Sequence, residues 1–247
     1  MMTKNISGGR TTYGHVVGIL MTDSLIPRIP GDPGHAETFS FPVVYEVLKG
    51  FPFDDLIAVK KDHMDILIDR AKALEDKGVS LVAADCGLFG PFQEDIKSRL
   101  QIPFIGSALD MVPLLQRFLP SNQKVGILTG DTSLLKKAHL EASAIDPDTV
   151  AMAGMENSLE FKKVVIDRSP ELDIEKMRQG VVDAALTLSS KSLGAVVLEC
   201  TNLISFRMDI QKALKVPVFD LVSLIEFYIS GLRLQNFQSS FIKKESY

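Results

Sequence analysis

Two cysteines are the residues in this sequence whose placement points to chemistry. Cys86 ends the stretch "GVSLVAADC" and Cys200 ends "GAVVLEC", so each thiol stands where a run of apolar residues stops. The chain has no other cysteine. A thiolate can act as a base or a nucleophile, but a free thiol with a pKa of about 8.5 is only slightly ionised at pH 7. We therefore expect backbone N–H groups at the start of a following helix to stabilise the thiolate.

The sequence contains an internal repeat, in which the two cysteines are equivalent. The segment "VVGILMTDS" at 16–24 resembles "VGILTGDTS" at 125–133, and "EDIKSRLQIPFI" at 94–105 resembles "MDIQKALKVPVF" at 208–219. Three pairs of residues are each separated by 114 positions: Cys86 and Cys200, Asp95 and Asp209, and Pro103 and Pro217. Three matches at one offset indicate that both halves of the chain follow the same structural plan.

Strand and helix patterns alternate along both halves. Short apolar runs, rich in β-branched residues, predict buried strands at 16–20, 56–59, 79–84, 104–105, 125–128, 164–166, 195–198 and 218–219. Apolar residues at helical spacing predict helices at 63–77, 92–100, 132–142, 174–190 and 206–214. This alternation predicts an α/β fold with two pseudo-symmetric Rossmann-like lobes, each built on a parallel sheet. Ligands bind such sheets beyond the carboxyl ends of the strands, so we expect the active site in the cleft between the lobes.

Composition and charge argue against several classes of partner. The chain has 27 basic and 31 acidic residues without a basic run, which excludes the electrostatic pattern of a nucleic-acid-binding protein. Its apolar runs are far shorter than the roughly 20 residues needed to cross a bilayer. The start of the sequence, "MMTKNISGGRTTYGH", lacks the apolar core of a signal peptide. We therefore expect a cytoplasmic protein whose thiols stay reduced.

No pattern in the sequence calls for a metal ion or a cofactor. The four histidines show no ligand spacing, and two cysteines so far apart form no zinc motif. Neither G-x-G-x-x-G nor a phosphate-binding loop follows any expected strand. We expect the protein to work without a metal or a cofactor.

Four short motifs carry a resemblance to a known family: "TDS" at 22–24, "DCG" at 85–87, "GDTS" at 130–133 and "ECTN" at 199–202. With the repeat, they resemble the aspartate/glutamate racemase superfamily, over about residues 16–232. This superfamily includes amino-acid and hydantoin racemases, maleate isomerase and arylmalonate decarboxylase. The Cys-Thr-Asn triplet resembles an uncharacterised branch of it. The resemblance implies two lobes, with the last strand and helix, about 216–232, returning to the first. The first lobe would then comprise 1–100 plus 216–247, and the second 101–215.

The resemblance also implies a reaction. One cysteine, Cys86 or Cys200, would remove a proton from a carbon next to a carboxylate, and the other would deliver a proton to the opposite face. Three alternatives are a cis–trans isomerase with a covalent cysteine adduct, a decarboxylase, and a non-catalytic protein that binds small carboxylates. The decarboxylase is disfavoured because that chemistry uses a single cysteine. Relatives are commonly dimers, so a homodimer is expected.

The expected substrate-binding residues flank the two cysteines and the two first strands. Many racemases of this group have Cys-Asn-Thr at the first site, where this chain has Gly87 and Leu88 after the cysteine. At the second site Asn202 stands where glutamate racemases have histidine. The candidates are Asp23, Ser24, Arg28, Gly87, Leu88, Thr129, Asp131, Thr132, Thr201 and Asn202. Helix capping is the alternative for Asp131 and Thr132.

Two further features concern the surroundings of the site. Asp85 and Glu199 precede the cysteines, and strand alternation predicts that they point to the other face. This favours surface or capping roles, and a role in supporting the site from behind is the alternative. The segment 26–46 has four prolines and no counterpart in the second half. Long irregular loops often form lids, so we expect it to close over the cleft. Arg28 in this loop could clamp a carboxylate, and a solvated arginine is the alternative.

Overall fold

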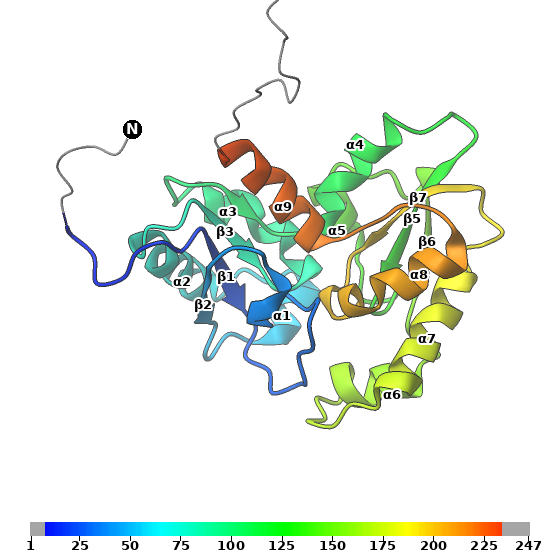
Figure 1. The fold of residues 1–247 in the computed structure, drawn as a ribbon, viewed down its shortest axis with the longest axis horizontal. Coiled ribbons are helices and arrows are strands. Elements are labelled where there is room, and N and C mark those ends of the chain that lie inside the picture. Colours follow the sequence, from blue (N-terminus) through cyan, green and yellow to red (C-terminus); the bar gives the residue numbers. More distant parts are fainter. Residues whose placement is uncertain (1–7, 234–247) are drawn as a thin grey trace, which may run out of the picture.

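The computed structural model describes residues 8–233 and contains two four-stranded sheets that lie beside each other (Figure 1). The first sheet, in the order β2-β1-β3-β4, consists of β1 (Val17–Met21), β2 (Val43–Val47), β3 (Leu81–Ala84) and β4 (Phe104–Ile105). The second, in the order β6-β5-β7-β8, consists of β5 (Lys124–Thr129), β6 (Val150–Gly154), β7 (Leu193–Leu198) and β8 (Val218–Phe219). Every strand pair is parallel. The predicted α/β fold with two equivalent lobes is therefore confirmed.

Helices surround both sheets. They are α1 (Phe53–Ala58), α2 (Met64–Asp76), α3 (Gln93–Lys97), α4 (Val112–Gln116), α5 (Lys137–Ala142), α6 (Leu159–Phe161), α7 (Ile174–Leu186), α8 (Arg207–Leu214) and α9 (Leu221–Leu232). A π-helix spans Lys162–Ile166, and 3₁₀ helices span Ala36–Thr38, Gly87–Phe92, Ala108–Met111, Pro147–Thr149 and Thr201–Phe206. None of the helices in residues 8–233 is both long and apolar enough to cross a membrane.

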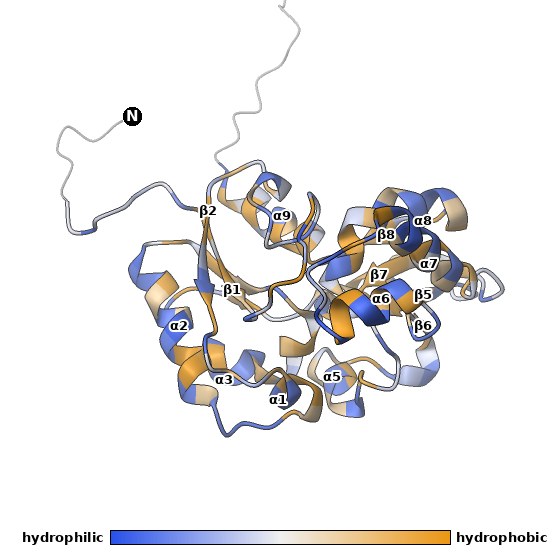
Figure 2. Cartoon of the chain, turned by 90° about the horizontal axis from the view of Figure 1, so that it is seen from below, coloured by the Kyte–Doolittle hydropathy of each residue, from blue (hydrophilic) through white to orange (hydrophobic). Residues whose placement is uncertain are grey.

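Parallel sheets covered on both faces require strands that are apolar throughout. All residues of β1 and β3 are buried. Figure 2 shows this pattern as hydrophobic strands surrounded by helices of mixed hydropathy. The helix α2 presents a buried stripe of Leu67, Ala71 and Leu74 to the first sheet. Gly18 in β1 allows this close approach, because a Cβ atom there would lie 2.9 Å from the Leu74 side chain.

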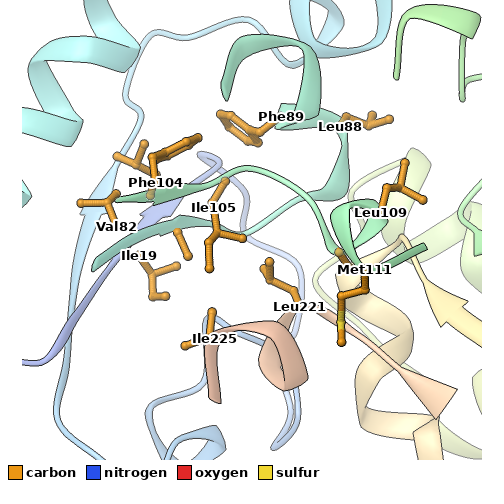
Figure 3. Close-up of a cluster of buried hydrophobic side chains, with 14 of the residues drawn as sticks. Ile19, Val82, Leu88, Phe89, Phe104, Ile105, Leu109, Met111, Leu221 and Ile225 are labelled. Atoms are coloured by element: carbon orange, nitrogen blue, oxygen red, sulfur yellow. The ribbon is translucent and has the colours of Figure 1, made fainter. Parts of the chain in front are cut away.

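The C-terminal helix crosses from the second lobe to the first. Leu221 and Ile225 of α9 are fully buried in the core formed around β1, β3 and β4 (Figure 3). Each such aliphatic side chain contributes about 1.5–3 kcal/mol of hydrophobic stabilisation. The preceding strand β8 stays in the second sheet, where Val218 pairs with Val196. The expectation that strand and helix both return to the first lobe is therefore correct for the helix and wrong for the strand.

The first half makes the same crossing. The strand β4 pairs with β3, so Phe104–Ile105 belongs to the first sheet, although the expected lobe boundary put it in the second. The segment Ala108–Met111 and helix α4 then pack against β5 and β7. Each half thus keeps its fourth strand and gives the next helix to the other lobe. Residues 1–7 and 234–247, at the two ends of the expected first lobe, lie outside the described residues.

Two expected strands are helical. Residues 56–59 form the end of α1 and its C-cap, and 164–166 belong to the π-helix. The strand positions beside β1 and β5 are taken by β2 and β6. A short apolar run fits a buried helix as well as a strand, and here tertiary packing decides. The other six strands and all five helices are present, although the helix expected at 132–142 begins only at Lys137.

The irregular segment before β2 connects the lobes. Gly31 adopts a φ of +106°, and a Cβ atom there would lie 2.7 Å from the Cα of Ser205 in the second lobe. The Ser205 hydroxyl donates a hydrogen bond of 3.4 Å to the carbonyl of Ile29. The segment therefore lies across both lobes. Its closure over a ligand remains a prediction.

Replacing Gly31 with alanine tests this contact, with Gly50→Ala as the matched control. Both glycines have positive φ, so both substitutions cost about 1 kcal/mol of backbone strain. Only Gly31 has a close neighbour, whereas nothing lies within 4 Å of a Cβ at Gly50. We expect Gly31→Ala to lower the free energy of unfolding by about 1–3 kcal/mol more than Gly50→Ala, measured by urea denaturation. Equal losses would show that the contact with Ser205 is not tight.

Candidate active site

A cavity of about 320 Å³ lies at the carboxyl ends of the central strands, and both cysteines line it. Thr22 and Cys86 come from the ends of β1 and β3 in the first lobe. Thr129 and Cys200 come from the ends of β5 and β7 in the second. A cavity is therefore present where the site was predicted, and each lobe contributes one thiol to it.

Each cysteine is the last extended residue before a 3₁₀ helix. Cys86 precedes Gly87–Phe92, and Cys200 precedes Thr201–Phe206. The backbone N–H of Leu88 lowers the pKa of the Cys86 thiol, and the N–H groups of Asn202 and Leu203 lower that of Cys200. The expected N–H donors are thus present at both thiols.

Burial outweighs these donors. Burial is the largest effect on the pKa of both thiols, and it raises that of Cys86 well above its ordinary value and also raises that of Cys200. The Glu199 carboxyl is the next effect at both thiols and raises the pKa further. Both thiols therefore carry their protons at pH 7, and a thiolate forms only when this electrostatic environment changes.

Asp85 and Glu199 are buried, each 2% exposed, and both line the cavity. The expectation of surface or capping roles is therefore wrong. The strands β3 and β7 end before these residues, so strict alternation no longer applies at positions 85 and 199. A carboxylate directly before the cysteine in both repeats was the signal that could have identified them.

The two carboxyl groups have different partners. Asp85 accepts hydrogen bonds from the N–H and hydroxyl of Thr22, at 3.0 and 2.9 Å, and from Arg28 at 2.9 Å. Glu199 Oε2 accepts a hydrogen bond of 2.6 Å from the Thr129 hydroxyl, and its Oε1 is buried without a partner. Burial raises the pKa of Asp85, although Arg28 opposes the rise. Burial also raises the pKa of Glu199 to about 7.

Arg28 is bound by carboxylates of its own chain. Its side chain is 13% exposed, and its two terminal nitrogens contact Asp32 at 2.8 Å and Asp85 at 2.9 Å. The amide of Asn202 donates to Asp32 at 3.0 Å from the second lobe. Arg28 lines the cavity, but it is neither a free carboxylate clamp nor a solvated arginine. It joins the segment 26–46 to the end of β3.

Three other candidates make contacts within the protein. The buried Thr201 hydroxyl donates to the backbone carbonyl of Asp85 in the opposite lobe. Gly87 is not among the cavity-lining residues and packs against Glu199, where a Cβ atom would lie 2.4 Å from Oε1. Thr132 is also absent from the lining and donates to Glu156. A role of Gly87 and Thr132 in binding the substrate stays a prediction.

The remaining candidates line the cavity: Asp23, Ser24, Leu88, Thr129, Asp131 and Asn202. Asp131 also accepts a hydrogen bond of 2.7 Å from the Ser133 N–H, so it shapes a turn as well. The helix α5 starts only at Lys137, so Asp131 does not cap it. These residues therefore lie at the cavity, and their binding of a substrate stays a prediction.

The cavity lining includes four residues that the sequence patterns did not indicate: Phe51, Phe53, Phe161 and Arg168. The Arg168 guanidinium lies 5.9 Å from the centroid of the Phe53 ring, and no carboxylate in residues 8–233 forms an ion pair with it. These residues are distant in sequence from both cysteines, so no local pattern pointed to them. Within the same residues, no three His, Cys, Asp or Glu side chains cluster as metal ligands do.

Comparisons with known proteins give a family match and several relatives. Residues 22–225 match the family model described as Asp/Glu/Hydantoin racemase. A dimethylsulfoniopropionate lyase from Durusdinium sp. clade D is 26% identical over 226 residues, 87% of this chain and 74% of that protein. Dimethylsulfoniopropionate lyase 5 from Emiliania huxleyi is also 26% identical, but the match covers only 45% of it.

Solved structures share the fold. Allantoin racemase from Pseudomonas fluorescens superposes with a TM-score of 0.58 at 15% identity, covering 88% of this chain and 90% of that one. Glutamate racemase from Bacillus anthracis gives a TM-score of 0.57 at 15% identity, covering 88% and 81%. At this identity the likeness concerns the fold alone.

Arg28→Gln tests the buried ion pairs. Without Arg28 the pKa of Asp85 rises further, and a carboxyl with a raised folded-state pKa loses stability as the pH rises above its unfolded-state value of about 4. We expect the free energy of unfolding to fall by about 3 kcal/mol at pH 8 and by less at pH 4.5. Urea denaturation at both pH values measures this.

Arg178→Gln is the matched control. Arg178 also contacts two carboxylates, Glu175 and Asp209, but its side chain is 39% exposed. We expect a much smaller change than for Arg28→Gln, because solvent screens the ion pairs of this exposed arginine. An Arg28→Gln loss that is small, or that is the same at both pH values, would contradict the assignment of Arg28 as the counter-ion of Asp85.

Proposed function

The chain belongs to the Asp/Glu/hydantoin racemase family, and on this basis we propose that it is a cofactor-independent enzyme that inverts a carbon next to a carboxylate. Cys86 and Cys200 act as the acid/base pair. The substrate class is a small carboxylic acid, such as an amino acid or a hydantoin-related acid, of a size that suits a cavity of about 320 Å³.

One observation carries this proposal: the two thiols reach the same cavity from opposite lobes. Inversion requires a base on one side of a carbon and an acid on the other. A single wall cannot supply both, whereas two equivalent strand ends facing one cavity can. The internal repeat provides this arrangement directly, because it places a cysteine at the same point in each half.

The proton balance is simple. One cysteine, as a thiolate, takes the proton from the substrate carbon, and the electron pair of the broken C–H bond is delocalised onto the adjacent carboxylate. The other cysteine, as a thiol, gives its proton to the opposite face and becomes the thiolate. Once one thiol has lost its proton, the site holds one thiol and one thiolate before and after the transfer, so the roles exchange for the reverse direction.

The substrate carboxylate needs hydrogen-bond donors that are not already bonded to other groups of the protein. The Arg28 guanidinium and the Thr201 hydroxyl bond within the protein. The Ser24 hydroxyl and the Arg168 guanidinium line the cavity and can donate to a carboxylate. We propose these two residues as the donors to the substrate carboxylate.

A second candidate is elimination, favoured by the lining of the cavity. Removal of the same proton can expel a leaving group from the next carbon and form a double bond. The relatives' name, dimethylsulfoniopropionate lyase, describes a substrate with a sulfonium cation. Phe51, Phe53 and Phe161 line the cavity, and aromatic rings of this kind attract a cationic leaving group.

Cys86→Ser and Cys200→Ser test the acid/base pair. The protein is incubated in D₂O with pooled amino acids, hydantoins and small hydroxy acids, and loss of α-proton signal is followed by proton NMR. A hydroxyl is a far weaker acid than a thiol, so we expect racemisation to fall by at least about 100-fold in each variant. Unchanged melting temperatures serve as the control for folding. Full activity in both variants would rule out the two-thiol mechanism.

Incubation with dimethylsulfoniopropionate distinguishes racemisation from elimination. An eliminating enzyme releases dimethyl sulfide and acrylate, which headspace chromatography and NMR detect. We expect no release above the uncatalysed rate if racemisation is the reaction. Release at an enzymatic rate, abolished by substitution of one cysteine only, would replace the racemase proposal with the lyase.

A further inference from the structure

The two halves of the site differ in one respect that the repeat does not predict. Asp85 and Glu199 hold equivalent positions, one residue before Cys86 and Cys200. Asp85 is paired with Arg28 at 2.9 Å. In the part of the chain that the structure describes, no lysine or arginine pairs with Glu199. A carboxylate at Glu199 would be buried without a counter-ion, which is costly.

Glu199 is close to both cysteines and raises the pKa of both thiols. It precedes Cys200 in the chain, and its carbonyl oxygen and Oε1 pack against Gly87, the residue after Cys86. A Cβ atom at Gly87 would lie 2.4 Å from both oxygens, so glycine is required there. One carboxyl oxygen is held by Thr129, and the other, Oε1, is buried beside Gly87 without a partner. The carboxyl group is therefore fixed where its charge reaches both cysteines.

We propose that Glu199 is a positioning residue that controls the ionisation of both thiols: as a neutral acid it permits a thiolate in the cavity, and as a carboxylate it suppresses one. The inference rests on the proposed function only in assuming that the thiolate takes part in catalysis. The effect of Glu199 on thiol ionisation is a property of the protein without substrate.

The electrostatics of the cavity support this role. Two negative charges in a water-poor space repel strongly, since little solvent screens them. When one proton leaves a thiol and one joins Glu199, an S–H bond breaks, an O–H bond forms, and the net charge of the cavity is unchanged. Burial holds the pKa of Glu199 at about 7, so the change of state falls in the physiological range.

Other charged groups near Glu199 do not replace it in this role. Asp85 and Asp32 share Arg28 as a counter-ion in a buried network, and each raises the pKa of one thiol by less than Glu199 does. Asp131, at the end of β5, is hydrogen-bonded to Ser133. Asp23, Asp54 and Arg168 also line the cavity but are exposed, so water screens them.

Alkylation with iodoacetamide tests the proposal, because the reagent reacts with the thiolate and needs no substrate. The rate at Cys86 and Cys200 is measured by peptide mass spectrometry from pH 5.5 to 8.5 in the full chain, for wild type and Glu199→Gln. A high-pKa thiol gains about tenfold in rate per pH unit. We expect the wild-type rate to rise by less than this between pH 6 and 8, as Glu199 ionises. In Glu199→Gln the rise is about tenfold throughout, which makes the variant several-fold faster at pH 8.5 and equal at pH 5.5.

Two further variants complete the test. Glu160→Gln removes another buried carboxyl, one that bonds with Lys163 and Asp173 and does not line the cavity, and we expect a wild-type profile. Glu199→Asp keeps a carboxyl and should retain the shallow region near pH 7. A Glu199→Gln profile parallel to wild type, whether equal in rate or faster by one factor at every pH, would overturn the proposal. That result would not bear on proton transfer by the cysteines, because the Cys86→Ser and Cys200→Ser variants test it separately.

Discussion

Four of the acidic groups that line the cavity between the two lobes have a pKa that burial raises. Asp85, Cys86, Glu199 and Cys200 therefore compete for the small amount of negative charge that the site can hold. Arg28 stabilises the negative charge on Asp85 as its counter-ion. Glu199 and the two thiols have no such counter-ion, so we infer that protons can be exchanged among these three groups.

The lobes must hold a fixed relative position for this arrangement to persist. Each half gives a helix to the other lobe, through α9 in one direction and α4 in the other. Near the cavity, Thr201 bonds with the Asp85 carbonyl, and Gly87 packs against Glu199. In the segment 26–46, Arg28 pairs with Asp32, and Gly31 packs against Ser205 of the second lobe. The same contacts that join the lobes also orient the acidic groups beside the thiols.

The cysteine pair and the fold class could be predicted from the sequence, because the repeat offset and the strand pattern are local signals. The roles of Arg28 and Thr201 could not, since their partners Asp85 and Asp32 are set by packing between distant segments. Residues 56–59 were misassigned because a short apolar run fits a helix or a strand equally well. Strand alternation gives the wrong side-chain direction for Glu199, because β7 ends at Leu198, one residue earlier.

The most direct test of the central claim is the isotope pattern of the first turnovers in D₂O. A protiated substrate enantiomer is converted to low extent, and deuterium is measured separately in product and in recovered substrate. Two thiols acting from opposite faces predict deuterium in the product and almost none in the recovered substrate, because each face exchanges through its own cysteine. Deuterium appearing equally in both would mean that a single base serves both faces, and would contradict the account.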